Sequence, residues 1–131
     1  MSKPLSASDI RKAFMKPTLK TEIVKLQRLG IEVTVMEMDA GRLETYESLL
    51  VKVDDDGKAE RALDNINAKI AVMSIVDDKG QLVFTPDDVE MLAHSYGKDV
   101  KAVANKAAVL SGLYAAEDVE KKSEPDRTSD T

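Results

Sequence analysis

Residues 21–38 read TEIVKLQRLGIEVTVMEM, and this stretch decides the fold. Ile31, Val33 and Val35 alternate with the residues between them, which is the period of two expected of a half-buried β-strand. The connector at 27–30 contains a glycine and has the length of a hairpin loop. The sequence therefore predicts a β-hairpin over about residues 21–38.

Helical patterns surround this hairpin. Before it, a short helix is predicted over about residues 5–14, because Ser6 and Asp9 have the spacing of a capping box and Pro17 disfavours continuation. After it, the spacing of apolar residues predicts helices over about residues 40–53, 58–76, 86–96 and 98–113.

The predicted helix ends rest on local residue chemistry. Asp39 is a candidate N-cap, and the run at 54–57 (three aspartates and a glycine) opposes helix continuation. Thr85 followed by Pro86 is a strong helix start, because threonine caps well and proline suits the first helical position. Between these elements, residues 82–84 are predicted to form a short extended segment.

These elements add up to a small α+β domain, mainly α-helical, with one β-hairpin near the N-terminus. We predict that residues 1–122 form a single domain. Residues 123–131 contain no apolar side chain, so they are predicted to be a disordered C-terminal tail.

The composition bounds the function classes. The 131 residues suit one domain, and 43% of them are apolar. The absence of cysteine excludes disulfides, thiol nucleophiles and cysteine-based metal sites. No apolar run follows the N-terminal residues as in a signal peptide, and none approaches the length of a membrane span. We therefore expect a protein that is neither exported nor membrane-bound.

The charge pattern argues against a nucleic-acid partner. The chain carries 19 basic and 24 acidic residues, a net charge of −5. Basic residues are mixed with acidic ones along the whole sequence, whereas nucleic-acid-binding domains usually carry a basic stripe. We expect no nucleic-acid binding.

The acidic turns do not fit a calcium loop. Placing Gly57 at the sixth position of an EF-hand loop puts Lys52 and Leu63 at its two ends, where carboxylates are needed. Placing Gly80 there puts Ile75 at the first position, which fails for the same reason. Solvated turns are the better interpretation.

The sequence assigns no catalytic, cofactor-binding or metal-binding residue. His94 is the single histidine and has no cysteine partner for a zinc site. A Ser–His–Asp arrangement is defined by geometry and stays open, but no glycine-flanked serine suggests a nucleophile. No phosphate-binding glycine loop is present either. We expect a protein without cofactors that is not an enzyme.

The methionines have two possible roles. Met36 and Met38 fall in the predicted hairpin, and Met73 and Met91 fall on predicted helices. Core filling is the first interpretation, and an adaptable binding surface is the second.

Five segments, in this order, resemble the tail assembly chaperones of long-tailed, siphophage-type bacteriophages. The resemblance spans about residues 5–122 and rests on the order and spacing of elements. The longest segment contains a helix, an Asp-Gly type turn and a Leu-x-Phe segment. The five segments are LSASDIRKA (5–13), KTEIV (20–24), LGIEVTV (29–35), NAKIAVMSIVDDKGQLVF (67–84) and LSGL (110–113).

The resemblance implies a protein that binds the tape measure protein, keeps its apolar helices soluble and helps tail tube subunits gather around it. It also implies self-association, and a longer product of ribosomal frameshifting that contacts the tail tube protein. Such a protein acts in the host cell cytoplasm and is absent from the finished particle. The family supplies no catalytic residue, and the sequence assigns no partner-binding residue.

Three other functions stay open at this point. A small structural or connector protein of a phage would keep a place in the assembled tail. A nucleic-acid-binding regulator is disfavoured by the mixed charge pattern. A small hydrolase would need a cluster of polar groups that the sequence does not indicate.

Overall fold

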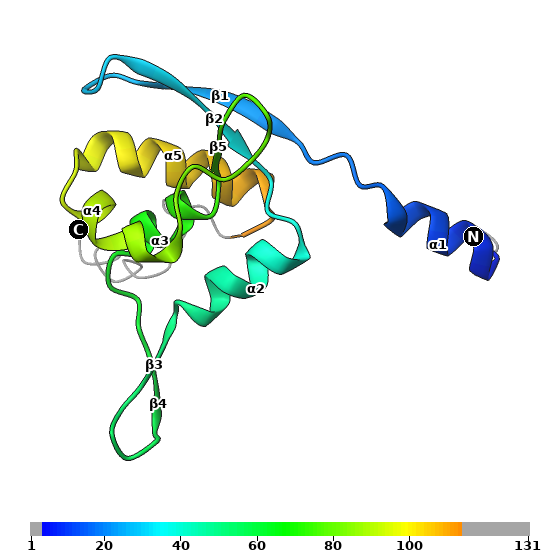
Figure 1. Ribbon diagram of the computed structural model, residues 1–131, viewed down its shortest axis with the longest axis horizontal. Coiled ribbons are helices and arrows are strands. Elements are labelled where there is room, and N and C mark those ends of the chain that lie inside the picture. The colour runs from blue at the N-terminus through cyan, green and yellow to red at the C-terminus, as the bar shows by residue number, and fades with distance from the viewer. Residues whose placement is uncertain (1–3, 114–131) are drawn as a thin grey trace, which may run out of the picture.

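The computed structural model describes residues 4–113 and confirms a small α+β domain (Figure 1). The helices are α1 (Ala7–Met15), α2 (Ala40–Ser48), α3 (Ile66–Val72), α4 (Val89–Ala93) and α5 (Gly97–Leu110), with a 3₁₀ turn η1 (Pro86–Asp88) before α4. The strands are β1 (Thr21–Leu26), β2 (Ile31–Met36), β3 (Val51–Val53), β4 (Ala59–Arg61) and β5 (Ile75–Val76).

The predicted hairpin is formed by β1 and β2. The two strands pair antiparallel, with Thr21 opposite Met36 and Leu26 opposite Ile31. The loop closes through the N–H of Gly30, which donates to the carbonyl of Leu26 at 2.8 Å, and Gly30 takes a φ of +71°. That left-handed conformation favours glycine, which explains its place in the connector. β5 adds a third strand beside β2, giving the order β1-β2-β5.

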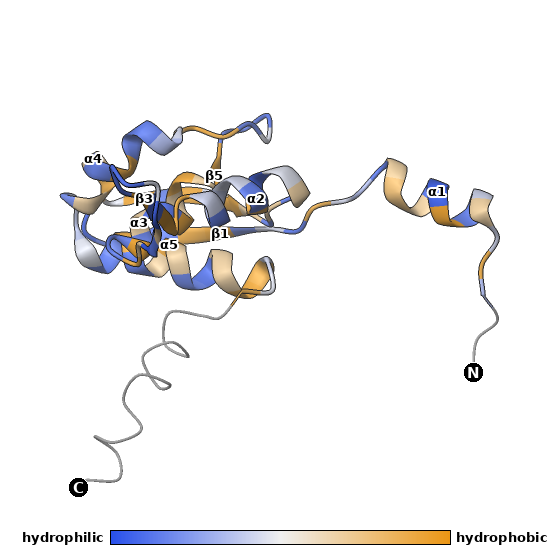
Figure 2. Cartoon of the chain, turned by 90° about the horizontal axis from the view of Figure 1, so that it is seen from below, coloured by the Kyte–Doolittle hydropathy of each residue, from blue (hydrophilic) through white to orange (hydrophobic). Residues whose placement is uncertain are grey.

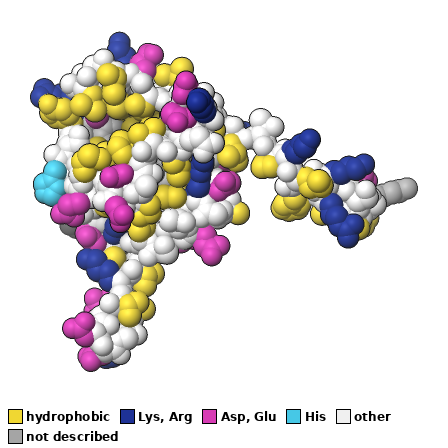
Figure 3. Space-filling model, viewed as in Figure 1, with side chains coloured by type: hydrophobic (Ala, Val, Ile, Leu, Met, Phe, Trp, Pro, Cys, Tyr) yellow, Lys and Arg dark blue, Asp and Glu magenta, His cyan; other side chains and the backbone are white. Residues whose placement is uncertain are grey.

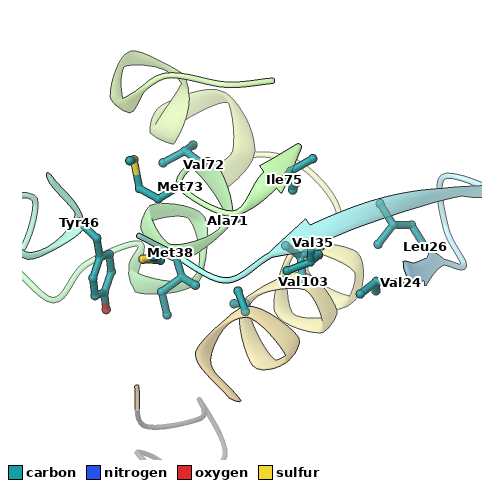
Figure 4. Close-up of a cluster of buried hydrophobic side chains, with 13 residues drawn as sticks. Val24, Leu26, Val35, Met38, Tyr46, Ala71, Val72, Met73, Ile75 and Val103 are labelled. Atoms are coloured by element: carbon teal, nitrogen blue, oxygen red, sulfur yellow. The ribbon is translucent and has the colours of Figure 1, made fainter. Parts of the chain in front are cut away.

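The core lies where α5 packs against the first hairpin on one side and against α3 on the other (Figure 4). Val35 of β2, Val72 of α3 and Val103 of α5 are fully buried. Burying a side chain of this size stabilises the fold by about 1.5–3 kcal/mol. Met38 and Met73 also belong to the core, so these two methionines fill space, whereas Met91 is exposed.

The predicted helix over residues 40–53 is wrong beyond Ser48. Asp39 caps the helix as expected, since its Oδ1 accepts from the N–H of Arg42 at 2.8 Å. The chain then leaves the helix and forms a second hairpin from β3 and β4. Val51 and Val53 are β-branched and two apart, which favours a strand over a helix.

The turn of this second hairpin is the acidic run that the sequence suggested as a helix end. Asp54 Oδ1 accepts from the N–H groups of Asp56 and Lys58, at 2.9 and 2.8 Å. Gly57 takes a φ of +82°. Aspartate that bonds to the following backbone, together with a left-handed glycine, makes a tight turn. The same residues therefore close a hairpin instead of ending a helix.

The predicted helix over residues 58–76 is much shorter in the structure. It begins at Ile66, after Asn65 in a left-handed conformation, and ends at Val72. The Ser74 hydroxyl donates to the carbonyl of Ile70 at 2.9 Å. The chain then becomes β5, which pairs with β2. This pairing joins residues about forty positions apart, so no local pattern revealed it.

One buried lysine joins α3 to the segment before it. Lys69 is 7% exposed, and its Nζ donates to the carbonyl of Ala62 at 2.8 Å. It also lies 3.4 Å from Asp64 Oδ1. Desolvation works to raise the pKa of Asp64, but Lys52 and Lys69 outweigh it and the pKa is lowered overall.

The last two predicted helices end earlier in the structure than the sequence suggested. Thr85 starts η1 with a capping box, since its N–H donates to Asp88 Oδ2 at 2.8 Å and its Oγ1 accepts from Asp87. The predicted helix over 86–96 stops at Ala93. The N–H groups of His94 and Ser95 then donate to carbonyls three residues back, as in a 3₁₀ turn, before α5 begins at Gly97. The helix predicted over 98–113 ends at Leu110.

The first helix is set apart from the rest. α1 is capped by Ser6, whose Oγ accepts from the N–H of Asp9 at 3.1 Å, and none of its residues is buried. Figures 1 and 2 show it projecting from the start of β1, with polar and apolar residues both on its surface. The predicted disordered tail lies outside the described residues, and the single domain over 1–122 stays a prediction.

A candidate interaction groove

An apolar groove of about 450 Å³ lies between the first hairpin and the loop that follows β5. We call it the apolar groove. It is open along one side, and strands, loop and helices all contribute to its walls. Its principal apolar lining residues are Ile31, Val33, Val83, Phe84, Leu92 and Val100.

The groove exists because the loop end of β2 is less covered than the rest of the hairpin. On the inward face of β2, Val35 is fully buried, Val33 is partly buried and Ile31 is 51% exposed. Leu26 of β1, the partner of Ile31, is buried in the core, so it is the loop end of β2 that overhangs. The apolar side chains of this overhang form one wall.

A single carboxylate holds the overhanging end of the hairpin. Asp99 lies in the first turn of α5 and is 2% exposed. Its two oxygens accept from the backbone N–H groups of Arg28 and Leu29, at 3.2 and 2.9 Å. The Arg28 guanidinium also lies 4.8 Å from the centre of the Tyr96 ring, a cation–π contact. These contacts fix the width of the groove at this end.

On the groove side, only part of the β2 backbone is paired with another strand. β5 pairs with Thr34 and Val35 of β2, and within the described residues no strand pairs with 31–33 on that side. The loop after β5 returns through Leu82, which forms a bridge with Val76. The groove therefore presents apolar side chains beside a short stretch of unpaired strand edge.

The charges at the groove are acidic. Glu32, Asp77 and Asp78 line it near solvent, and none of its lining residues is Lys or Arg. Asp77 also closes the turn after β5, because its Oδ1 accepts from the N–H groups of Lys79 and Gln81 at 2.8 and 3.0 Å. The result is an apolar floor with a negative rim.

The residues considered from sequence for catalysis or metal binding lie at the end of α4 and in two turns. His94 is exposed at the end of α4, and its Nδ1 lies 2.8 Å from the carbonyl of Glu90. The acidic runs at 54–57 and 77–80 are turns, as expected. Among residues 4–113, no cluster of His, Asp and Glu side chains is arranged to hold a metal ion. Over the same residues, no helix has the length and apolar character to cross a membrane.

Further apolar side chains are exposed outside the groove. Ile23 lies on the outer face of β1 and is 67% exposed, and Phe14 on α1 is 81% exposed. Figure 3 shows apolar side chains gathered on the body of the domain and again on the projecting helix. Isolated exposed apolar residues are ordinary, but an apolar groove and a projecting helix with an apolar face are typical of surfaces that bind other molecules.

Comparison with known proteins gives a match in structure and none in sequence. No protein-family model and no curated protein sequence matches the chain. The fold is similar to the structure of the bacteriophage HK97 tail assembly chaperone, with a TM-score of 0.56 and 15% sequence identity. The match covers 83% of this chain and 99% of the HK97 chain. At this identity the likeness establishes a shared fold.

The sequence did not reveal the groove. Its walls come from segments that are distant in the chain, and its depth depends on the contact between Asp99 and the hairpin loop. One signal was available: Leu29 is apolar although it lies in the hairpin loop, where a simple exposed loop would be polar.

Proposed function

We propose that this protein is a phage tail assembly chaperone that binds apolar helices of a tape measure protein and keeps them in solution. The observation that carries the proposal is the shared fold with the HK97 tail assembly chaperone over nearly the whole of that chain. The exposed apolar groove supports it, because a chaperone of this kind needs apolar surface that its own fold leaves open.

The groove suits one face of a helix. Helices that dock in apolar grooves do so through side chains at i, i+3, i+4 and i+7. The walls of Ile31, Val83 and Leu92 are aliphatic, so recognition depends on apolar burial and little on sequence. A groove that tolerates different sequences suits a partner whose helices carry many different apolar side chains.

The rest of the proposal concerns cellular context. We place the protein in the cytoplasm of the infected cell and outside the finished particle, acting in many copies along the tape measure protein. A longer frameshifted product would link these copies to tail tube subunits. The resemblance of the sequence to this family supports these points.

The test is co-expression with the tape measure protein of the same phage, followed by measurement of its soluble fraction. Wild-type protein should raise that fraction, and affinity capture should recover both chains together. Because the contact is apolar, the complex should survive high salt, which screens surface charges. A tape measure protein that is equally soluble without this chain would refute the proposal. Recovery of the chain from purified particles would favour a connector instead.

Matched variants locate the contact. Ile31→Asp places a charge on the groove wall, where the side chain is already half exposed, so the fold should tolerate it. Ile23→Asp adds the same charge to the same hairpin on the opposite face. The first variant should abolish solubilisation and the second should preserve it. Equal effects of the two variants would show that the groove is not the binding surface.

A further inference from the structure

The apolar groove has acidic groups on both sides of its mouth. β2 pairs with β5 as far as Thr34 and Val76. The same register, if it continued, would place Glu32 opposite Asp78. Pairing stops there because the chain turns at Asp77, so the groove opens between the end of β2 and the loop after β5. Glu32 therefore lies on one side of the mouth, and the two aspartates lie on the other.

The charges at the mouth are not neutralised by the protein. Neither Glu32 nor Asp78 has an ion-pair partner among residues 4–113. Lys25 lies opposite Glu32 across the first hairpin, yet no ion pair joins their side chains. Asp77 uses one carboxylate oxygen to close its own turn. Like charges on facing strands repel each other, so a cation bound between them is favoured.

The interior of the groove has a different chemistry. Phe84, Val100 and Val103 make its deeper walls apolar. Asp99 is the carboxylate within it, and both of its oxygens already accept backbone hydrogen bonds. No lining residue is Lys or Arg, so nothing in the groove attracts an anion. An occupant that matches both parts carries apolar side chains inward and positive charge at the level of the mouth.

We propose that the groove selects client helices whose apolar stripe is bordered on both sides by Lys or Arg. On a helix with apolar residues at heptad positions a and d, positions e and g border that stripe, whereas c and f point away from it. Lysines at e and g then lie beside Glu32 and Asp78 when a and d enter the groove. Apolar burial supplies the affinity, and the bordering charges supply the preference. The inference rests on the proposed function and adds a chemical selectivity to it.

The experiment compares three synthetic peptides of about three heptads, which is long enough to form a helix. All three share the same apolar residues at a and d, with one tryptophan at a central a position. The first has Lys at e and g, the second has Glu at e and g, and the third has the same number of Lys at c and f. The chain itself contains no tryptophan, so emission from the peptide reports binding. The third peptide controls for general attraction of a basic peptide to a chain of net charge −5.

The peptide with Lys at e and g should bind about three- to tenfold more tightly than either of the others, because surface ion pairs are individually weak. The double variant Glu32→Lys, Asp78→Lys changes two exposed side chains and should lose or reverse this preference. The double variant Asp55→Lys, Glu60→Lys makes the same change of net charge in the exposed second hairpin and should keep it. High salt should bring the three dissociation constants together without abolishing binding.

The outcomes separate the inference from the proposed function. Equal affinity of the wild-type protein for the first two peptides, or for the two lysine peptides, would overturn the inference and leave the proposed function intact. A preference that survives in the Glu32→Lys, Asp78→Lys variant would overturn it as well, because the selecting charges would then lie elsewhere. A wild-type protein that binds none of the three peptides would contradict the proposed function and the inference together.

Discussion

Asp99 is the residue whose removal should have the clearest effect. It is buried in the first turn of α5 and accepts two backbone hydrogen bonds from the loop of the first hairpin. We expect Asp99→Ala to detach this loop from α5 and to loosen the overhanging wall of the groove.

The magnitude comes from these two bonds. A hydrogen bond to a charged group contributes about 1.5–3 kcal/mol. The bond from Leu29 at 2.9 Å should carry most of this, and the one from Arg28 at 3.2 Å less. Both loop residues are exposed, so water can satisfy the released N–H groups. We therefore expect a total loss of about 2–3 kcal/mol, and a fall in Tm of about 8–12 °C for a domain of this size.

The measurement is urea unfolding followed by circular dichroism, because the chain has no tryptophan for fluorescence. Asp99→Asn keeps one acceptor and should lose roughly half as much as Asp99→Ala. Asp55→Ala, in the exposed turn of the second hairpin, is the matched control and should stay within about 0.5 kcal/mol of wild type. An Asp99→Ala variant as stable as the control would show that Asp99 does not hold the hairpin loop in place.

Three further predictions concern stability. Lys69→Met should lower stability by about 1–3 kcal/mol, because the buried carbonyl of Ala62 loses its donor, whereas Asp64→Ala should have a smaller effect because the Asp64 side chain is half exposed; urea unfolding compares them. Burial, and to a smaller extent the charge of Glu47, raise the pKa of Tyr46 above its usual value of 10.0. The unfolded chain therefore loses this proton first, and the free energy of unfolding should fall as pH rises above 10. Measured as Tm at a series of pH values, this fall should be smaller for Tyr46→Phe. Thr85→Ala should cost about 0.5–2 kcal/mol, and an unchanged urea midpoint would show that its capping box is dispensable.

The parts of the fold that local chemistry determines could be predicted from the sequence. The hairpin of residues 21–38 followed from alternation and a glycine-containing loop, and the structure places its strands at Thr21–Leu26 and Ile31–Met36. The caps at Ser6, Asp39 and Thr85 were also predicted, since a cap depends on residues within one helical turn.

The parts that depend on distant segments could not be predicted. β5 is a strand because β2 offers it a partner, and the apolar run at 70–76 suited a helix equally well. The second hairpin was missed because three aspartates and a glycine occur at helix ends and in turns alike. The groove was missed because it is defined by the position of a whole hairpin over α5.

The contact between the hairpin loop and Asp99 also provides a natural reporter of groove opening. The amides of Arg28 and Leu29 sit on an exposed loop, and their carboxylate acceptor protects them from exchange with solvent. Whenever the hairpin lifts from α5, both amides lose that acceptor together and exchange for deuterium. Their exchange rates therefore measure the free energy of local opening, which is smaller than that of global unfolding. An occupant that bridges the hairpin and α5 should slow the exchange of both amides, so binding could be followed without attaching a probe to the protein.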